Sequence, residues 1–263
     1  MPRLRSADGT VIGYDKTGSG PIVVLVDGAL AYRGYRGGRP LAAVLSSDFT
    51  VVAYDRRGRG ESTDVSPYSV DRELEDLAAL IDDAGSPASV YGFSSGAVLA
   101  LRAAARLGGK VARLVLHEPP FGGNDDAAKL KFAGYAQQMA ALIAGKRSGD
   151  AVAFFLSDML PPDALADMKQ SPDWALMEAV APTLVYDNAV MGDGAVPATL
   201  AETVAAPTWI LDGADSEPFK CEAADALAKA VPRAKRRTLQ GYGTLVPPEV
   251  LAPVLRGLLM EAL

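Results

Sequence analysis

The chain has 263 residues, of which 49% are hydrophobic and 22% are charged, and its formal net charge is −6. This length and composition predict one core with an insertion, and the acidic balance argues against a nucleic-acid partner, which would require a basic face. The single cysteine, Cys221, excludes an internal disulfide framework and fits a reducing compartment.

The first half of the chain alternates between predicted strands and predicted helices. Apolar runs and turn residues predict, in order, a hairpin over 2–16, a strand over 22–26, a helix over 40–46, a strand over 50–54, an amphipathic helix from Ser69 or Asp71 to Gly85, a strand over 88–91, a helix over 97–107 and a strand over 112–116. Such alternation is typical of an α/β fold with a mostly parallel sheet. Between the second strand and the amphipathic helix, residues 55–62 predict a structured surface loop rather than an anion site made by its arginines.

Gly92-Phe93-Ser94-Ser95-Gly96 stands between a short apolar run and a long one. A G-x-S-x-G stretch in a strand–turn–helix context predicts a nucleophile elbow, in which a sharp turn exposes the serine hydroxyl above the sheet. The alternative is a Gly/Ser turn without chemistry.

Two other strand ends carry candidate site residues. Gly28 and Ala29 follow the strand over 22–26, where their N–H groups and that of Ser95 could form an oxyanion hole; an ordinary strand-end turn is the alternative. His117 and Glu118 follow the strand over 112–116. Because adjacent strand residues point to opposite faces, His117 is expected to face the packing of the sheet if Glu118 faces the site.

Residues 123–205 interrupt the alternation with a predicted helical insertion, and residues 1–122 and 206–263 form the predicted core. Helices are expected over 128–146, 151–160, 162–170 and 174–181, with Asp125, Asp150 and Asp173 as cap candidates and Met191 in a following loop. This insertion predicts a lid in which methionines such as Met139 and Met177 adapt to a substrate, or in which they pack the lid onto itself.

The α/β pattern then resumes. The sequence predicts a strand over 207–211, a helix over 223–230, a strand over 235–239, a loop over 240–248 and a C-terminal helix from about Glu249. Asp212 and Asp215 follow the first of these strands.

With these features the chain resembles the α/β-hydrolases of the lipase, esterase and lactonase superfamily over nearly its whole length. The resemblance implies an α/β-hydrolase fold with Ser94 as the nucleophile and Gly28, Ala29 and Ser95 around the oxyanion. It leaves two positions for the triad acid. Asp215 follows the strand before the last, although the usual spacing falls on Ser216; Glu118 stands at a strand end ahead of two prolines and is preferred.

The same resemblance places Thr244 where the family has its catalytic histidine. The chain's one histidine, His117, is a weak candidate base and is expected to be a packing residue. Loss of the triad base costs on the order of 10⁶ in rate, and a threonine hydroxyl cannot replace it because its pKa is far from neutral.

We therefore expect an enzyme on an apolar, carbonyl-bearing small molecule that promotes cyclisation, elimination or rearrangement by positioning and oxyanion stabilisation. An esterase or lactonase with an atypical base and a non-catalytic binding protein are the alternatives. Neither a cofactor nor a metal site is expected, and the chain is expected to be a cytoplasmic monomer or homodimer without a membrane partner. The candidate substrate contacts are Phe93, Met139, Trp174, Met177 and Tyr242.

Overall fold

The computed structural model describes residues 2–261. Its strands form one sheet in the order β1-β2-β4-β3-β5-β6-β7-β8, parallel from β4 to β8 and antiparallel at β1 and β2. The strands are β1 (Arg3–Arg5), β2 (Val11–Thr17), β3 (Ile22–Val26), β4 (Thr50–Tyr54), β5 (Ala88–Phe93), β6 (Val111–His117), β7 (Thr208–Gly213) and β8 (Ala234–Leu239). The predicted α/β fold with a mostly parallel sheet is confirmed.

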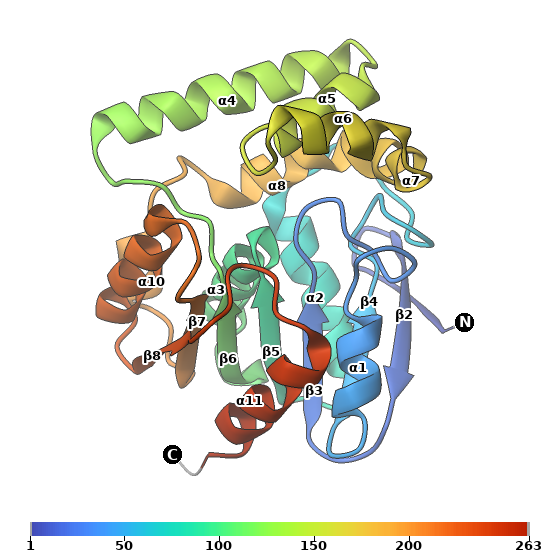
Figure 1. Cartoon of the computed structure of the whole chain (residues 1–263). Coiled ribbons are helices and arrows are strands. Elements are labelled where there is room, and N and C mark those ends of the chain that lie inside the picture. Colours follow the sequence, from blue (N-terminus) through green and yellow to red (C-terminus); the bar gives the residue numbers. More distant parts are fainter. Residues whose placement is uncertain (1, 262–263) are drawn as a thin grey trace.

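Helices cover both faces of this sheet (Figure 1). The helices are α1 (Arg39–Leu45), α2 (Val70–Ala84), α3 (Ser95–Leu107), η1 (Gly108–Lys110), α4 (Asp126–Ala144), α5 (Ser148–Leu156), α6 (Pro162–Gln170), α7 (Asp173–Val180), η2 (Ala181–Thr183), α8 (Leu184–Met191), α9 (Ala198–Ala201), α10 (Pro218–Ala230) and α11 (Pro248–Met260). None of the helices within residues 2–261 has the length and apolar character needed to cross a membrane.

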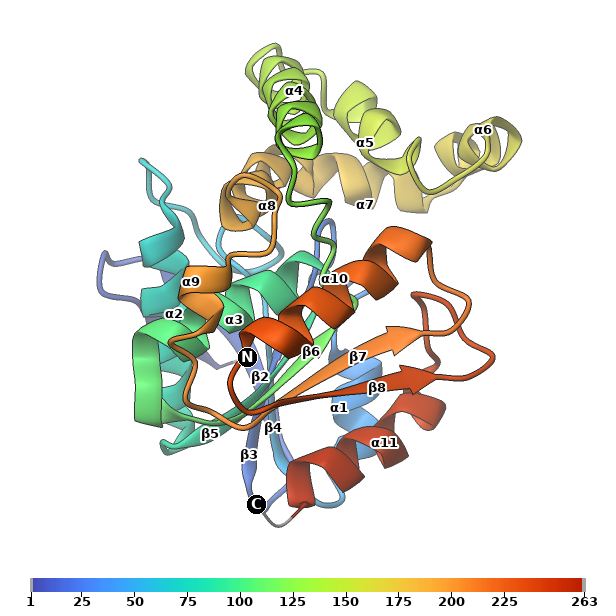
Figure 2. The same cartoon turned by 90° about the vertical axis from the view of Figure 1, so that its left-hand side faces the viewer.

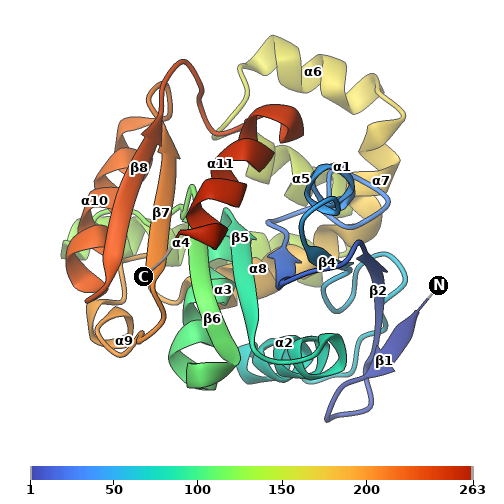
Figure 3. The same cartoon turned by 90° about the horizontal axis from the view of Figure 1, so that it is seen from below.

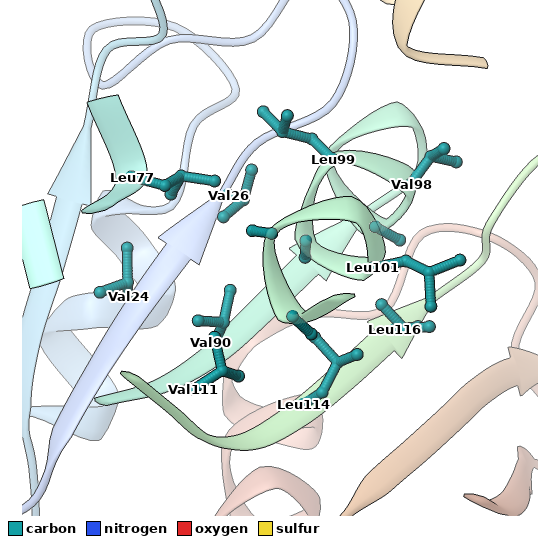
Figure 4. Close-up of a cluster of buried hydrophobic side chains, with 14 of the residues drawn as sticks. Val24, Val26, Leu77, Val90, Val98, Leu99, Leu101, Val111, Leu114 and Leu116 are labelled. Atoms are coloured by element: carbon teal, nitrogen blue, oxygen red, sulfur yellow. The ribbon is translucent and has the colours of Figure 1, made fainter. Parts of the chain in front are cut away.

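The sheet separates two apolar clusters. On one face lie α1 and α11 (Figure 3), which pack against a cluster that includes Leu25, Tyr91 and Val115. On the other face, α2, α3 and α10 pack against the opposite side chains of the same strands. Leu77 of α2 and Leu101 of α3 lie in this second cluster among strand valines and leucines (Figure 4). Burial on both faces explains why β3 and the centre of β4 are continuous apolar runs in the sequence.

Helices α4 to α8, which we call the helical block, lie together beyond the carboxyl ends of the parallel strands (Figures 1 and 2). The predicted insertion over 123–205 is longer than this block, because Val196, Ala201 and Val204 pack into the core cluster instead. Met191, expected in a loop, is the last residue of α8. Of the three predicted caps, Asp125 accepts a hydrogen bond from the Ala128 amide at 2.9 Å, whereas the other two lie within the first turns of α5 and α7.

Candidate active site at the carboxyl edge of the sheet

Ser94 occupies the sharp turn between β5 and α3. Its backbone has φ 54° and ψ −128°, a strained conformation for a residue other than glycine, and its amide donates to the His117 carbonyl at 2.9 Å. The flanking glycines permit this turn. A Cβ on Gly92 would lie 2.4 Å from the Gly96 carbonyl oxygen, and a Cβ on Gly96 would lie 2.2 Å from that of Val26. This is the geometry that the sequence predicts for a nucleophile elbow.

The turn after β3 brings Gly28 against this elbow. Gly28 is buried, and a Cβ built on it would lie 3.0 Å from Ser94 Cβ and 3.5 Å from Ser94 Oγ. Ser95 is the first residue of α3, so its amide is one of those that lack an intrahelical acceptor. Gly28, its neighbour Ala29 and Ser95 therefore remain the candidate donors for an oxyanion beside the Ser94 hydroxyl.

Of the two candidate acids, Glu118 is the one held inside the protein. Its side chain is fully buried, and its Oε1 accepts hydrogen bonds from the Gly213 amide and the Ser216 hydroxyl, both at 2.7 Å. Asp215 is exposed, and its amide donates to the Tyr242 carbonyl at 3.0 Å. The geometry thus favours Glu118 as the carboxylate that orients its neighbours, as preferred from the sequence.

Thr244 contacts the carboxylate of Glu118. Its Oγ1 donates to Glu118 Oε2 at 3.1 Å, and Lys220 Nζ donates to the same Oγ1 at 2.6 Å. Lys220 is buried, and its Nζ also lies 2.9 Å from Glu217 Oε2 and 3.7 Å from Glu118 Oε2. A hydroxyl and an ammonium therefore satisfy the carboxylate that would orient a histidine in a triad.

The sequence interpretation missed Lys220 because it began the helix at Ala223. Helix α10 begins five residues earlier, at Pro218. Proline at the first helical position is a known start signal, since its missing N–H is not needed there. That signal would have placed Lys220 in the first turn of the helix.

His117 lies beneath the site and not against the elbow hydroxyl. Its ring is fully buried, and Nδ1 shares a hydrogen bond of 2.7 Å with the Tyr91 hydroxyl. Burial lowers the pKa of His117 to about 4, so the ring is neutral at physiological pH. Among the hydrogen bonds of the described residues, none joins the Ser94 hydroxyl to a basic side chain.

A cavity of about 250 Å³ lies between α1, α11 and the loop after β8. Phe93, one of the candidate substrate contacts, lines it together with His117 and Thr244. Tyr242 is partly buried and packs against the cluster beneath α11.

The three other candidate substrate contacts lie in the helical block. Met139 and Met177 are almost completely buried in an apolar cluster of the block and do not line the cavity, which supports the alternative that they pack the block onto itself. Trp174 borders a separate surface depression between α5 and α7. The structure therefore does not bring these three residues to the elbow.

Buried ion pairs fasten the helical block to the elbow. Asp187 of α8 accepts hydrogen bonds from Arg56 at 2.6 Å, Arg59 at 2.7 Å and the Ser95 hydroxyl at 2.7 Å. Burial alone would raise the pKa of Asp187, but the two guanidinium groups hold that pKa below its usual value. Arg57 pairs with Asp76 at 2.8 Å.

The expectation of a surface loop over 55–62 is therefore wrong. Arg56, Arg57 and Arg59 are among the largest fully buried side chains of the described residues. They are buried because each has a carboxylate partner from a segment distant in the sequence. Glycines with positive φ are expected in a structured loop of this kind, and Gly58 and Gly60 have φ of 75° and 53°.

Asp27, which precedes Gly28, has a carboxyl group with a raised pKa. Its Oδ2 accepts the Gly38 amide at 3.0 Å, and burial raises the pKa of Asp27 to about 7. Its folded-state pKa is thus above its unfolded value of 3.8. The charged form is disfavoured in the folded protein, so this residue costs stability as the pH rises from about 4 to 7.

We expect the Asp27→Asn variant to gain stability relative to the parent protein as pH increases over this range. A pKa difference of about three units, at about 1.4 kcal/mol per unit, corresponds to about 4 kcal/mol in the free energy of unfolding. Because the carboxyl group is partly exposed, we expect a gain of about 2 kcal/mol. Urea unfolding of both proteins at pH 4.5 and pH 8 measures the difference. Equal stability differences at the two pH values would contradict the assigned pKa.

The chain is similar to known proteins over most of its length. Residues 23–253 match the alpha/beta hydrolase family. The crystal structure of an alpha/beta hydrolase from Sphaerobacter thermophilus is 45% identical, with a TM-score of 0.85 over 97% of this chain and 98% of that one. The uncharacterized hydrolase YraK of Bacillus subtilis is 36% identical over 120 residues, which is 42% of each chain. The enol-lactonase from Burkholderia xenovorans is 22% identical and shares the fold, with a TM-score of 0.71 over 99% of this chain and all of that one.

Proposed function

The chain belongs to the alpha/beta hydrolase family, and from that premise we propose that it converts an apolar, carbonyl-bearing small molecule without hydrolysing it. The reaction is a cyclisation, elimination or rearrangement in which the substrate carbonyl becomes an enolate or a related oxyanion. The amides near Gly28 and Ser95 stabilise that charge, and the helical block acts as a lid over an apolar site.

One observation carries this proposal: Glu118 contacts Thr244 and Lys220 where a hydrolytic triad requires an imidazole. The Lys220 ammonium donates hydrogen bonds and has no lone pair with which to accept the Ser94 proton. Without a base the serine is a poor nucleophile, so an acyl-enzyme forms too slowly to matter. The oxyanion site and substrate positioning still give a rate on the order of 10³–10⁴ over water.

Residues at the site have distinct roles in this scheme. The turn at Gly28 binds the carbonyl oxygen, and the Ser94 hydroxyl donates a hydrogen bond to the same oxygen as charge develops there. The exposed carboxylate of Asp215 takes the proton from the substrate carbon as the enolate forms and returns it when the product forms, because Glu118 is fully buried and already bound to Thr244. Lys220 holds Thr244 and Glu118 in place.

Turnover in ¹⁸O-labelled water tests the proposal directly. We expect the purified protein, incubated with lactones, β-keto esters and polyketide-like diketones, to form a product that carries no ¹⁸O in a carboxyl group. Hydrolysis would add one labelled oxygen to the carboxylic acid that it forms. Tight ligand binding with no product in any case would instead favour a non-catalytic binding protein.

Two variants separate the proposed mechanism from an acyl-enzyme route. Gly28→Ala crowds Ser94 and should lower kcat/KM for the identified substrate by about 10²-fold, because it displaces an oxyanion donor. Ser94→Ala should lower it by about tenfold, since one hydrogen bond is lost and not a covalent step. Gly109→Ala, where a Cβ meets no atom within 4 Å, is the matched control and should be unchanged. A loss of 10⁵-fold or more in Ser94→Ala would overturn the non-covalent scheme.

An esterase or lactonase that uses an atypical base is the second candidate. It is favoured by the 45% identity to an alpha/beta hydrolase over nearly the full length of both chains. The labelled-water experiment distinguishes it, because only this candidate places ¹⁸O in the product acid.

A further inference from the structure

The cavity between α1, α11 and the loop after β8 has mostly apolar walls. Its hydrophobic lining residues are Leu25, Leu41, Phe93, Leu245, Val246 and Leu251. Leu245 is 77% exposed, so an apolar ligand in the cavity would remove some of this surface from water. The volume of about 250 Å³ exceeds the roughly 150 Å³ that suffices for a benzene ring. A ligand with an apolar body of that size therefore fits, and the free polar groups of the wall decide what else it carries.

Arg36 is the first free polar group of this wall. Its guanidinium lies 5.3 Å from the centre of the Tyr35 ring and forms no hydrogen bond or ion pair within residues 2–261. The backbone of Arg36 has φ 52°, a strained conformation for a residue other than glycine. Strain of this kind is commonly retained at ligand sites, and a guanidinium binds a carboxylate through two parallel hydrogen bonds. Arg36 therefore suits the anionic end of an organic acid.

Asp27 is the second free polar group. Its Oδ2 accepts the Gly38 amide at 3.0 Å, whereas its Oδ1 makes no hydrogen bond within residues 2–261. Unlike His117 Nε2, this Oδ1 is not among the completely buried polar atoms of the described residues that lack a partner. Asp27 and Arg36 form no ion pair with each other in this part of the chain. Asp27 can therefore accept a hydrogen bond from a ligand while Arg36 binds an anion.

The other polar side chains of the wall are not available to a ligand. The Tyr91 hydroxyl is bound to His117 Nδ1, and the Nε2 atom of the same ring is completely buried. Thr244 is bound to Glu118 and to Lys220. Among its described side chains, the cavity thus offers one cation and one carboxyl acceptor, separated by apolar surface.

We propose that this cavity binds a small hydroxy acid, whose carboxylate pairs with Arg36, whose hydroxyl donates to Asp27 and whose apolar body packs against the walls. A hydroxyl is favoured over an ammonium as the donor, because an uncharged group loses less hydration between apolar walls. Binding of this kind needs neither the Ser94 hydroxyl nor an oxyanion donor, so it is independent of the reaction proposed above.

Three related compounds test the two contacts separately. Isothermal titration calorimetry of the full chain uses 4-hydroxybenzoate, benzoate and phenol at pH 8, above the Asp27 pKa of about 7. Benzoate lacks the hydroxyl and phenol lacks the carboxylate, so each leaves one of the two protein groups without its partner. We expect 4-hydroxybenzoate to bind at least tenfold more tightly than either of the other two.

Variants assign each contact to its residue. Arg36→Met should weaken binding of 4-hydroxybenzoate at least tenfold and leave that of phenol unchanged. Asp27→Asn should weaken binding of 4-hydroxybenzoate about fivefold, because a charged acceptor becomes neutral, without weakening that of benzoate. Arg106→Met, at an exposed position in the last turn of α3, is the matched control and should leave all three affinities unchanged.

Three results would overturn the proposal. One is equal affinity of the parent protein for 4-hydroxybenzoate and phenol. Another is equal affinity of the parent and Arg36→Met proteins for 4-hydroxybenzoate. The third is a folded parent protein that binds none of the three compounds, which would leave the cavity to water.

Discussion

Replacing Thr244 by histidine is expected to raise hydrolysis of a short-chain nitrophenyl ester by at least 10²-fold. Thr244 Oγ1 already lies 3.1 Å from Glu118 Oε2, so an imidazole at this position reaches the carboxylate that would orient it. An imidazole there would give Ser94 a general base, and removing such a base costs on the order of 10⁶ in a complete triad. Steady-state kinetics of the parent and Thr244→His proteins measure the gain.

Controls for this variant follow from the neighbouring residues. Ser94→Ala in the Thr244→His background should return the rate to that of the parent protein, since the new base then has no nucleophile to activate. Lys220→Met in the same background removes the ammonium that lies 3.7 Å from Glu118 and should raise the rate further. A folded Thr244→His protein with no gain in esterase activity would show that the missing imidazole is not what limits hydrolysis.

Substituting Asp187 by alanine is expected to lower the free energy of unfolding by about 3–5 kcal/mol. The change leaves the guanidinium groups of Arg56 and Arg59 buried with one fewer carboxylate between them, and it frees the Ser95 hydroxyl. Breaking a buried ion pair by removing one partner is costly because a charge stays behind in a poorly solvated place. Denaturant unfolding measures the loss.

Asp193, just after α8, provides the matched control for this substitution. It pairs with Lys129 at 3.1 Å, but its side chain is 59% exposed. Exposed pairs contribute 1 kcal/mol or less, so Asp193→Ala should cost far less than Asp187→Ala. Equal losses in the two variants would mean that the buried cluster does not stabilise the fold.

Much of the fold follows from short-range patterns in the sequence. The apolar runs of β3 and the centre of β4 mark a sheet covered on both faces, and Gly85 ends α2 in a left-handed conformation, as a C-terminal glycine predicts. Gly92 likewise indicates the elbow, because the close packing that requires it involves Gly96 and Ala97 in the same turn. These features were predictable because their causes are local.

The residues that the sequence did not reveal depend on distant partners. Arginines are usually exposed, so a loop with three of them predicts a surface position. Their burial depends on carboxylates such as Asp187, which lies more than 120 residues away in a helix that the sequence pattern did not predict. Lys220 and Thr244 similarly meet Glu118 only through the folded sheet. Pairings of this kind have no periodicity that a single sequence can display.

The ion pairs of Asp187 also determine which helix of the helical block can move away from the core. Helix α8 cannot move away from Ser95 without breaking the ion pairs that Asp187 makes with the buried Arg56 and Arg59, whereas α6 has no completely buried residue and, within the described chain, no ion pair to the core. Ligands are therefore expected to exchange past α6 while α8 stays in place. Amide protons of α6 should exchange with deuterium well before those of α8, which would identify α6 as the part of the helical block that opens while α8 stays attached to the core.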